Sequence, residues 1–206
     1  MDVSIPTNPP VVDGRRARRD RNRERVVDAL LALYAEGNIA PSIDLVAERS
    51  GVSHRSVFRY FEDLEELNRV AVERHFRAHQ HLFDLPLDDG PIADLADRVA
   101  VLVAHRVRLY EAVAPVARVG RMRAPRHKIL ATSLDIHRSN LRRQVLDQFS
   151  SELAALAEPE SKALGAAAAA LCSLETLESM RVDQKLSADQ TSAALTHALT
   201  RLFSSP

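Results

Sequence analysis

The sequence predicts an all-α fold, and three observations support this. Apolar residues recur at intervals of three or four along most of the 206 residues, whereas no alternation of apolar and polar residues extends beyond a few positions. Glycine occurs only six times, and several of these glycines stand where a helical period breaks. Ala, Leu, Arg, Glu and Asp are abundant. The length allows one or two domains, at roughly 100–200 residues each.

The charge of the chain limits how it can meet a partner. The 28 basic and 28 acidic residues cancel formally. Bulk charge alone would therefore not hold the chain on nucleic acid, and any basic surface must be local. Residues 15–25 carry the sharpest local excess, with seven arginines against two acids, and residues 1–14 are rich in proline and poor in apolar side chains. We therefore expect residues 1–19 to form a disordered basic arm.

Cysteine usage and hydropathy favour a soluble cytoplasmic protein. Cys172 is the only cysteine, which excludes an intrachain disulfide and fits a reducing compartment. Residues 163–174 form the longest uncharged stretch of note, and these 12 residues fall short of the about 20 that a membrane-spanning helix needs. The N-terminus does not have the basic region and long apolar core of a secretory signal.

Periodicity and breaking residues predict nine helices in order. We expect them at residues 21–36, 42–50, 53–61, 64–83, 92–110, 111–119, 126–156, 160–183 and 188–204. Gly37 is placed to end the first helix, and Ser42 and Ser53 are placed to cap the second and third. The residues that separate the later helices are Pro115, Gly120, Pro125 and Pro159.

The second and third helices have the spacing of a helix-turn-helix. Ala47, Gly51 and Val57 stand at offsets that such a unit needs: a small residue where the helices pack closely, a glycine for a left-handed turn, and an apolar anchor. The residues left on the outer surface of the second helix of this unit are His54, Arg55, Ser56 and Arg59. Such side chains reach base edges and phosphates. The alternative is an ordinary pair of core helices, and the adjacent basic arm favours DNA binding over it.

The stretch from Ile43 to Phe61 resembles the DNA-binding signature of the tetracycline-repressor (TetR) family. The resemblance covers about residues 24–67 and is specific at Ala47, Gly51, Val52, Ser53, Phe58, Tyr60 and Phe61. It implies a three-helix DNA-binding domain at residues 20–63 and a larger helical domain at 64–206. The residues that we expect to contact operator DNA are Arg21, Ser42, Ser53, His54, Arg55, Ser56, Phe58, Arg59 and Tyr60.

One position departs from the family pattern. Members of the family usually carry a lysine near the start of the fourth helix, where it contacts phosphate. Here Leu64 stands at that position, and four acidic residues surround it, Glu62, Asp63, Glu65 and Glu66. We therefore expect a weaker phosphate contact at this point, offset by the arginine-rich arm.

The resemblance also implies a repressor that a small molecule releases from its operator. It implies a homodimer through the last two helices, with an effector pocket inside the second domain. Polar residues on or near apolar stripes are the pocket candidates: Arg106, Tyr110, Met122, Ser133, His137, Cys172 and Thr176. Each also has a structural interpretation, because a buried arginine must pair with a carboxylate or reach solvent, and Cys172 can be a small buried hydrophobe.

Helix faces give partial support for the dimer. The helix expected at 160–183 has two apolar faces, one with Leu164, Ala167, Leu171 and Leu174 and another with Ala168, Cys172 and Thr176. A helix with two apolar faces needs two partners. The alternative is a helix that is fully buried within a monomer.

Two further function classes compete with this interpretation. A metal-sensing regulator of the same fold would use His75 and His79, with His81, His105 or Asp84 nearby, although the spacing defines no third or fourth ligand. An enzyme is not predicted, because the sequence has no glycine-rich phosphate loop, no nucleophile elbow and no zinc-protease pair. No cofactor and no metal site are predicted.

Overall fold

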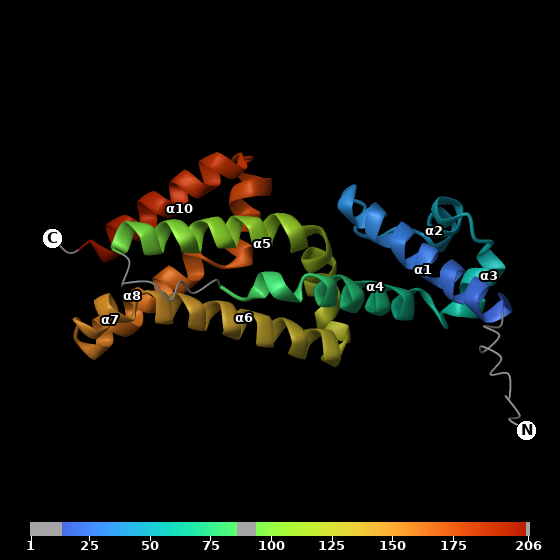
Figure 1. The fold of residues 1–206 in the computed structure, drawn as a ribbon, viewed down its shortest axis with the longest axis horizontal. Coiled ribbons are helices and arrows are strands. Elements are labelled where there is room, and N and C mark those ends of the chain that lie inside the picture. Colours follow the sequence, from blue (N-terminus) through green and yellow to red (C-terminus); the bar gives the residue numbers. More distant parts are fainter. Residues whose placement is uncertain (1–13, 86–93, 205–206) are drawn as a thin grey trace, which may run out of the picture. The chain divides into compact units, whose positions relative to one another are not determined.

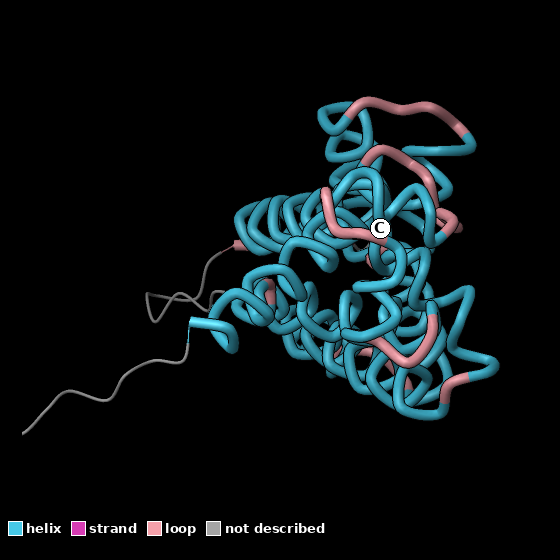
Figure 2. The backbone as a smooth tube through the Cα atoms, turned by 90° about the vertical axis from the view of Figure 1, so that its right-hand side faces the viewer, coloured by secondary structure: helices cyan, strands magenta, loops and turns pink. Residues whose placement is uncertain are grey.

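The computed structural model describes residues 14–85 and 94–204, and these are almost entirely helical (Figures 1 and 2). Within those ranges there are ten α-helices and no strand, which confirms the all-α prediction. The chain divides into two compact units, whose boundary lies between Ala71 and Val72. The boundary expected from the sequence, 63/64, precedes α4 (Leu64–Ala78), and the structure places it inside that helix.

The first unit consists of three helices and the start of α4. The three are α1 (Gly14–Ala35), α2 (Ile43–Ser50) and α3 (His54–Tyr60). The side chains that fill its interior are Val26, Val27, Leu30, Leu33, Tyr34, Val46, Val57, Phe61 and Leu67. The Tyr34 hydroxyl donates a hydrogen bond to the Asn68 side-chain oxygen of α4, so this buried phenol keeps a polar partner.

The beginning of α1 corrects the expected disordered arm. The helix begins at Gly14, so residues 15–19 are helical, and residues 1–13 lie outside the described part of the chain. Arginine and alanine are both strong helix formers, and they extend the amphipathic helix that follows by one turn or more. The arginines of this segment are therefore presented at helical spacing.

The second unit holds six further α-helices. They are α5 (Leu95–Arg123), α6 (Lys128–Gln148), α7 (Ser150–Ala154), α8 (Glu158–Leu171), α9 (Leu174–Glu178) and α10 (Ala188–Phe203). Short 3-10 turns precede α5 and α6, and a π-helical turn, η3 (Ser179–Asp183), continues α9. Helices α5 and α10 lie side by side (Figure 1).

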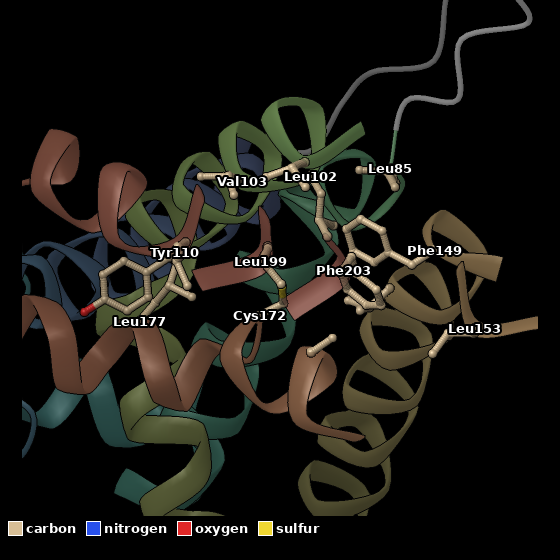
Figure 3. Close-up of a cluster of buried hydrophobic side chains, with 14 of the residues drawn as sticks. Leu85, Leu102, Val103, Tyr110, Phe149, Leu153, Cys172, Leu177, Leu199 and Phe203 are labelled. Carbon is tan, nitrogen blue, oxygen red and sulfur yellow. The ribbon is translucent and has the colours of Figure 1, made fainter. Parts of the chain in front are cut away.

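The core of the second unit gathers where α5, α6, α8 and α10 meet. Figure 3 shows Leu102 and Val103 of α5 beside Leu199 and Phe203 of α10. The rings of Phe149 and Phe203 stack with centroids 4.1 Å apart. This packing joins residues that are about a hundred positions apart in the sequence.

Two helix predictions in this unit were wrong, in opposite directions. The expected helices 92–110 and 111–119 form the single helix α5, which runs through Pro115. Proline removes one helical hydrogen bond, and the burial of its neighbours Val113 and Val116 compensates for that loss. The expected helix 160–183 is instead interrupted after Cys172, because the Ser173 hydroxyl accepts a hydrogen bond from the Thr176 amide at 3.1 Å and begins α9.

The bounds expected for the other helices differ less from those in the structure. The expected helix 126–156 is divided near Phe149 into α6 and α7, and the expected helix 64–83 ends at Ala78, before a 3-10 turn over Gln80–Phe83. No helix in residues 14–85 or 94–204 is both long enough and apolar enough to cross a membrane.

Candidate functional site

The turn between α2 and α3 has the geometry that the motif requires. Ser42 caps α2, with its hydroxyl accepting a hydrogen bond from the Leu45 amide at 3.3 Å. Gly51 has φ +63° and ψ 26°, the left-handed conformation that glycine adopts without strain. The Val52 amide then donates to the Ala47 carbonyl oxygen at 3.2 Å, which closes the turn. The left-handed turn predicted at Gly51 is therefore confirmed.

Apolar anchors fix α3 on the first unit. Val57 and Phe61 are buried, as their spacing predicted. The guanidinium of Arg23 on α1 lies over the Phe61 ring, 4.8 Å from its centroid. A cation over an aromatic face adds about 0.5–1 kcal/mol at a partly exposed site. The outer face of α3 is thus held in a defined orientation.

The outer face of α3 exposes the side chains expected to meet DNA. Ser53, His54, Arg55, Phe58 and Arg59 are exposed, and Ser56 is partly exposed. Phe58 is 47% exposed, which is unusual for a large apolar side chain. The edge of the His54 ring meets the Phe58 ring with centroids 4.8 Å apart.

His54 also connects α3 with α2. Its Nε2 lies 3.4 Å from a carboxylate oxygen of Asp44, and both side chains remain largely exposed. Ser53 differs from its predicted role, because its hydroxyl makes no hydrogen bond to the backbone of α3. It donates instead to the Ser56 hydroxyl at 3.0 Å. Two hydroxyls are thus paired at the exposed start of α3.

Tyr60 is held by contacts that sequence reasoning missed. Its hydroxyl oxygen accepts hydrogen bonds from Asn22 Nδ2 at 3.5 Å and from Arg59 Nη2 at 3.2 Å. These bonds lower the pKa of Tyr60, and the nearby charge of Arg19 acts in the same direction. Because the oxygen accepts twice, its own proton remains available to a phosphate.

The first turns of α1 therefore lie close to the end of α3. Arg19, Asn22 and Arg23 share one face of α1 at helical spacing, and each contacts or influences an aromatic residue of the Tyr60–Phe61 pair. Arg21, which the sequence placed among the DNA contacts, is exposed and lies roughly 200° around the helix from Arg19. The role of Arg21 stays a prediction.

The acidic residues at the start of α4 have a structural role. Asp63 accepts a hydrogen bond from the Glu66 amide at 2.7 Å, and Glu66 accepts one from the Glu62 amide at 2.6 Å. This arrangement satisfies amide groups that would otherwise be open at the helix N-terminus. The same amides are the usual anion-binding groups of a helix start. The weaker phosphate contact expected from Leu64 at the family lysine position stays a prediction, and the acidic residues around this helix start agree with it.

The second unit contains a cavity of about 350 Å³, here called the α6 cavity. Its volume falls within the roughly 300–1,000 Å³ of small-molecule pockets. Aromatic rings form one wall, with His137 stacked on Phe83 at 4.2 Å and near-parallel to Phe76 at 5.4 Å between centroids. Burial lowers the pKa of His137, so its ring is neutral at neutral pH.

Small side chains and charges complete the α6 cavity. Alanines of α8 and Cys172 also line the cavity, together with three arginines and one carboxylate: Arg121, Arg138, Arg142 and Glu175. Arg138 donates to a Glu175 oxygen from Nε at 3.1 Å and from Nη2 at 2.8 Å. Burial raises the pKa of Glu175, but the Arg138 hydrogen bonds outweigh it, so the pKa is lowered and Glu175 is ionised.

The structure separates the seven predicted pocket residues. His137 and Cys172 line the α6 cavity, and Ser133 lines a neighbouring hollow of about 280 Å³ that shares His137. Burial raises the pKa of the Cys172 thiol to about 11, so this sulfur is an apolar wall rather than a thiolate. Cys172 also belongs to the hydrophobic core cluster that includes Leu177 and Leu199 (Figure 3).

The other four predicted pocket residues are not part of the α6 cavity lining. Tyr110 donates to Glu178 at 2.9 Å, and Glu178 also accepts from Arg118 at 2.6 Å. Thr176 donates to the Ala170 carbonyl oxygen at 2.6 Å, and Met122 is 48% exposed. Tyr110 and Thr176 are therefore engaged in hydrogen bonds within the chain, and Met122 faces solvent. Their positions on helical stripes could not reveal these contacts.

Arg106 is fully buried without the carboxylate that the sequence led us to expect. Its guanidinium donates to His105 Nδ1 at 2.7 Å, to the Gln144 side-chain oxygen at 2.9 Å and to the Leu141 carbonyl oxygen at 2.9 Å. Burial lowers the pKa of Arg106 to about 10, which still leaves it charged at neutral pH. Neutral acceptors therefore stabilise a buried positive charge.

The histidines proposed for a metal site are engaged elsewhere. His75 Nε2 lies 3.1 Å from the Ala112 carbonyl oxygen, and His79 Nδ1 lies 2.8 Å from the His75 carbonyl oxygen. His105 Nε2 lies 3.1 Å from the Asp84 carbonyl oxygen. Over residues 14–85 and 94–204, no three His, Cys, Asp or Glu side chains gather closely enough to hold a metal ion.

Comparison with known proteins identifies the fold. A transcriptional regulator from Rhodococcus sp. Rha1 superposes with a TM-score of 0.63 and 19% identity, covering 87% of this chain and 95% of that one. A TetR-family transcriptional regulator from Streptomyces coelicolor superposes with a TM-score of 0.62 and 19% identity, covering 87% and 81%. A TetR/AcrR-family transcriptional regulator from Aquifex aeolicus gives a TM-score of 0.60, 15% identity, and coverage of 88% and 99%.

No protein-family model and no curated protein matches the sequence. The structural matches span nearly the whole of this chain, at identities below 25%. The chain therefore has the fold of TetR-family transcriptional regulators, with a helix-turn-helix in its first unit and a larger helical second unit.

Proposed function

We propose that the chain is a DNA-binding transcriptional regulator of the TetR type. The observation that carries this proposal is the outer face of α3, where His54, Arg55, Phe58 and Arg59 stand exposed on a helix fixed by the Gly51 turn and the Val57 anchor. An exposed helix with these groups suits the major groove, where arginine pairs with guanine and apolar groups meet the thymine methyl. The regulators that share this fold support the same conclusion.

The finer proposal is a cytoplasmic repressor that a small molecule releases from its operator. The α6 cavity supports a small-molecule effector, because its volume and mainly apolar wall fit such a ligand. Phe76 of α4 belongs to this wall, and α4 begins in the DNA-binding unit. A ligand that contacts Phe76 would therefore contact the helix whose first residues, 64–71, belong to the first unit.

We further propose a homodimer through α8 and α10. The exposed small side chains of α8 outside the cavity lining, Ala163 and Ala167, form a surface that allows close helix approach. Leu195 and Leu199 of α10 are buried within the chain, which leaves the opposite face of α10 for a partner. Light scattering on the wild type and on Ala167→Glu tests this, with a wild-type monomer as the result that rejects it.

DNA selection tests the main proposal. The full chain is used to enrich duplexes from a random pool, and the enriched duplex is compared with a shuffled duplex by fluorescence anisotropy. Arg55→Ala is expected to remove most of the preference, whereas Arg143→Ala, an exposed arginine of α6, is expected to retain it. Failure to enrich any sequence would reject a sequence-specific regulator.

A further inference from the structure

The α6 cavity has a wall suited to a flat apolar body. The His137 ring lies nearly parallel to the Phe76 and Phe83 rings, with interplanar angles of 17° and 28°, and the two phenylalanine rings are tilted by 40° from each other. The α8 side chains that line the cavity, Ala166, Ala169 and Ala170, offer only methyl groups. Stacked rings together with small apolar side chains favour a planar, aromatic guest. His137 is neutral, so the ring wall brings no charge of its own.

The charges around this wall do not balance. Glu175 is the one carboxylate among the lining residues, and it pairs with Arg138 while the charge of Arg121 acts on it from further away, so three arginines share one carboxylate. Arg121 comes only within 3.9 Å of Glu178, whose oxygens already accept from Tyr110 and Arg118. Arg142 is exposed and has no ion pair with any residue of the described ranges. Arg142 is therefore without an ion pair at the cavity, and Arg121 has only a long one.

A third arginine adds positive potential from behind the wall. Arg106 is buried among neutral acceptors, and its charge reaches Cys172, which lines the cavity, because the two groups perturb each other's pKa. A charge in a low-dielectric interior is screened less than one in water. The field of Arg106 thus adds to that of Arg121 and Arg142, and positive potential in a concave site concentrates anions.

We propose that the α6 cavity binds a flat, apolar organic anion, whose body lies against the rings of Phe76, Phe83 and His137 and whose acidic group meets Arg121 and Arg142. A carboxylate or sulfonate accepts two parallel hydrogen bonds from a guanidinium, which gives such a group both affinity and orientation. The assignment rests on the proposed function, since it names the chemical class of the effector.

The test uses two fluorescent probes that differ by one anionic group. 8-Anilinonaphthalene-1-sulfonate carries a sulfonate, and N-phenyl-1-naphthylamine is the same aromatic body without it. We expect the purified full chain to bind the anionic probe at least about tenfold more tightly, the scale of one charge-assisted hydrogen bond. Equal affinity for both probes, tighter binding of the neutral probe, or no binding of either would overturn the proposal.

Four variants test which arginines bind the anionic group of the probe. Arg121→Gln and Arg142→Gln are each expected to weaken the anionic probe about tenfold and to leave the neutral probe unchanged. Arg143→Gln removes the same charge from a neighbouring exposed position outside the cavity and is expected to change neither. Glu175→Gln removes the carboxylate nearest to Arg138 and leaves it the exposed Asp135 at 3.6 Å, so the variant is expected to tighten the anionic probe, a gain that damage to the fold would not produce.

Other outcomes separate the ligand class from the proposed function. A flat cation such as rhodamine 6G that binds more tightly than the anion, and is lost in Glu175→Gln, would overturn the anionic assignment. An equal effect of Arg143→Gln would show general charge attraction and would also overturn it. Anion binding in the cavity without any change in DNA affinity would uphold the ligand class and reject the ligand-released repressor.

Discussion

Replacing Gly51 by alanine measures how much the α2–α3 turn depends on glycine. Gly51 has φ +63°, where a residue with a Cβ atom costs about 1–2 kcal/mol. Alanine also restricts the unfolded chain, which offsets part of that cost by about 0.4–1 kcal/mol. The new Cβ would lie 2.8 Å from Arg25 Nη2, the end of a flexible side chain that can move away. We therefore expect the free energy of unfolding to fall by about 1 kcal/mol.

Two other glycines supply matched controls. Gly37 has φ +90° with no atom within 4 Å of its Cβ position, so Gly37→Ala imposes the backbone strain without a neighbour. Gly14 has no positive φ and no atom within 4 Å, so Gly14→Ala is expected to be neutral or slightly stabilising. Urea unfolding followed by circular dichroism compares the three variants. If Gly51→Ala unfolds at the wild-type urea concentration, the argument from the left-handed turn is wrong.

Four further results follow from the site. Arg55→Ala should weaken operator binding by about 1–3 kcal/mol and random DNA much less; equal loss on both would reject base reading. Tyr60→Phe should weaken anisotropy-measured affinity for all duplexes by about 0.5–1.5 kcal/mol, and unchanged affinity would exclude the hydroxyl from phosphate contact. Arg19→Gln should make the slope of log affinity against log salt shallower by about 0.9, and an unchanged slope would place Arg19 off the phosphates. Burial and the charge of Arg106 lower the pKa of His105 from 6.5 to about 4. Between pH 6.5 and pH 4 the unfolded chain binds a proton at His105 that the folded chain does not. The free energy of unfolding therefore carries the full contribution of His105 above pH 6.5 and loses it as the pH falls toward 4, by up to roughly 3 kcal/mol. A His105→Asn variant with the same pH dependence of urea unfolding would contradict this assignment.

The helix-turn-helix could be predicted because its determinants are local. A small residue at Ala47, a left-handed turn at Gly51 and an anchor at Val57 act within eleven positions, and the exposed face of α3 follows from helical period alone. The helix ends in the second unit were harder. Pro115 predicts a break between two helices, yet α5 runs through it, because the residues around Pro115 are buried.

The sequence predicted only part of the lining of the α6 cavity. His137 and Cys172 could be singled out as polar or reactive groups on apolar stripes, but Phe76 and Phe83 read as ordinary core residues. Their contact with His137 joins segments more than fifty positions apart, which periodicity does not encode. The same holds for Asn22 and Tyr60, whose hydrogen bond depends on how α1 packs on α3.

The charge pattern of the first unit has one consistent explanation. The start of α4 is capped by carboxylates, with Asp63 accepting from the Glu66 amide and Glu66 from the Glu62 amide before the helix, and their charge repels phosphate. An acidic surface next to α3 would weaken DNA binding unless cations nearby outweighed it. The helical extension of α1 provides such cations, because Arg19 lies near Tyr60 on the face that also carries Arg23. The arginine-rich segment thus serves as part of a folded helix, and its contribution to DNA binding depends on which face of that helix each arginine occupies.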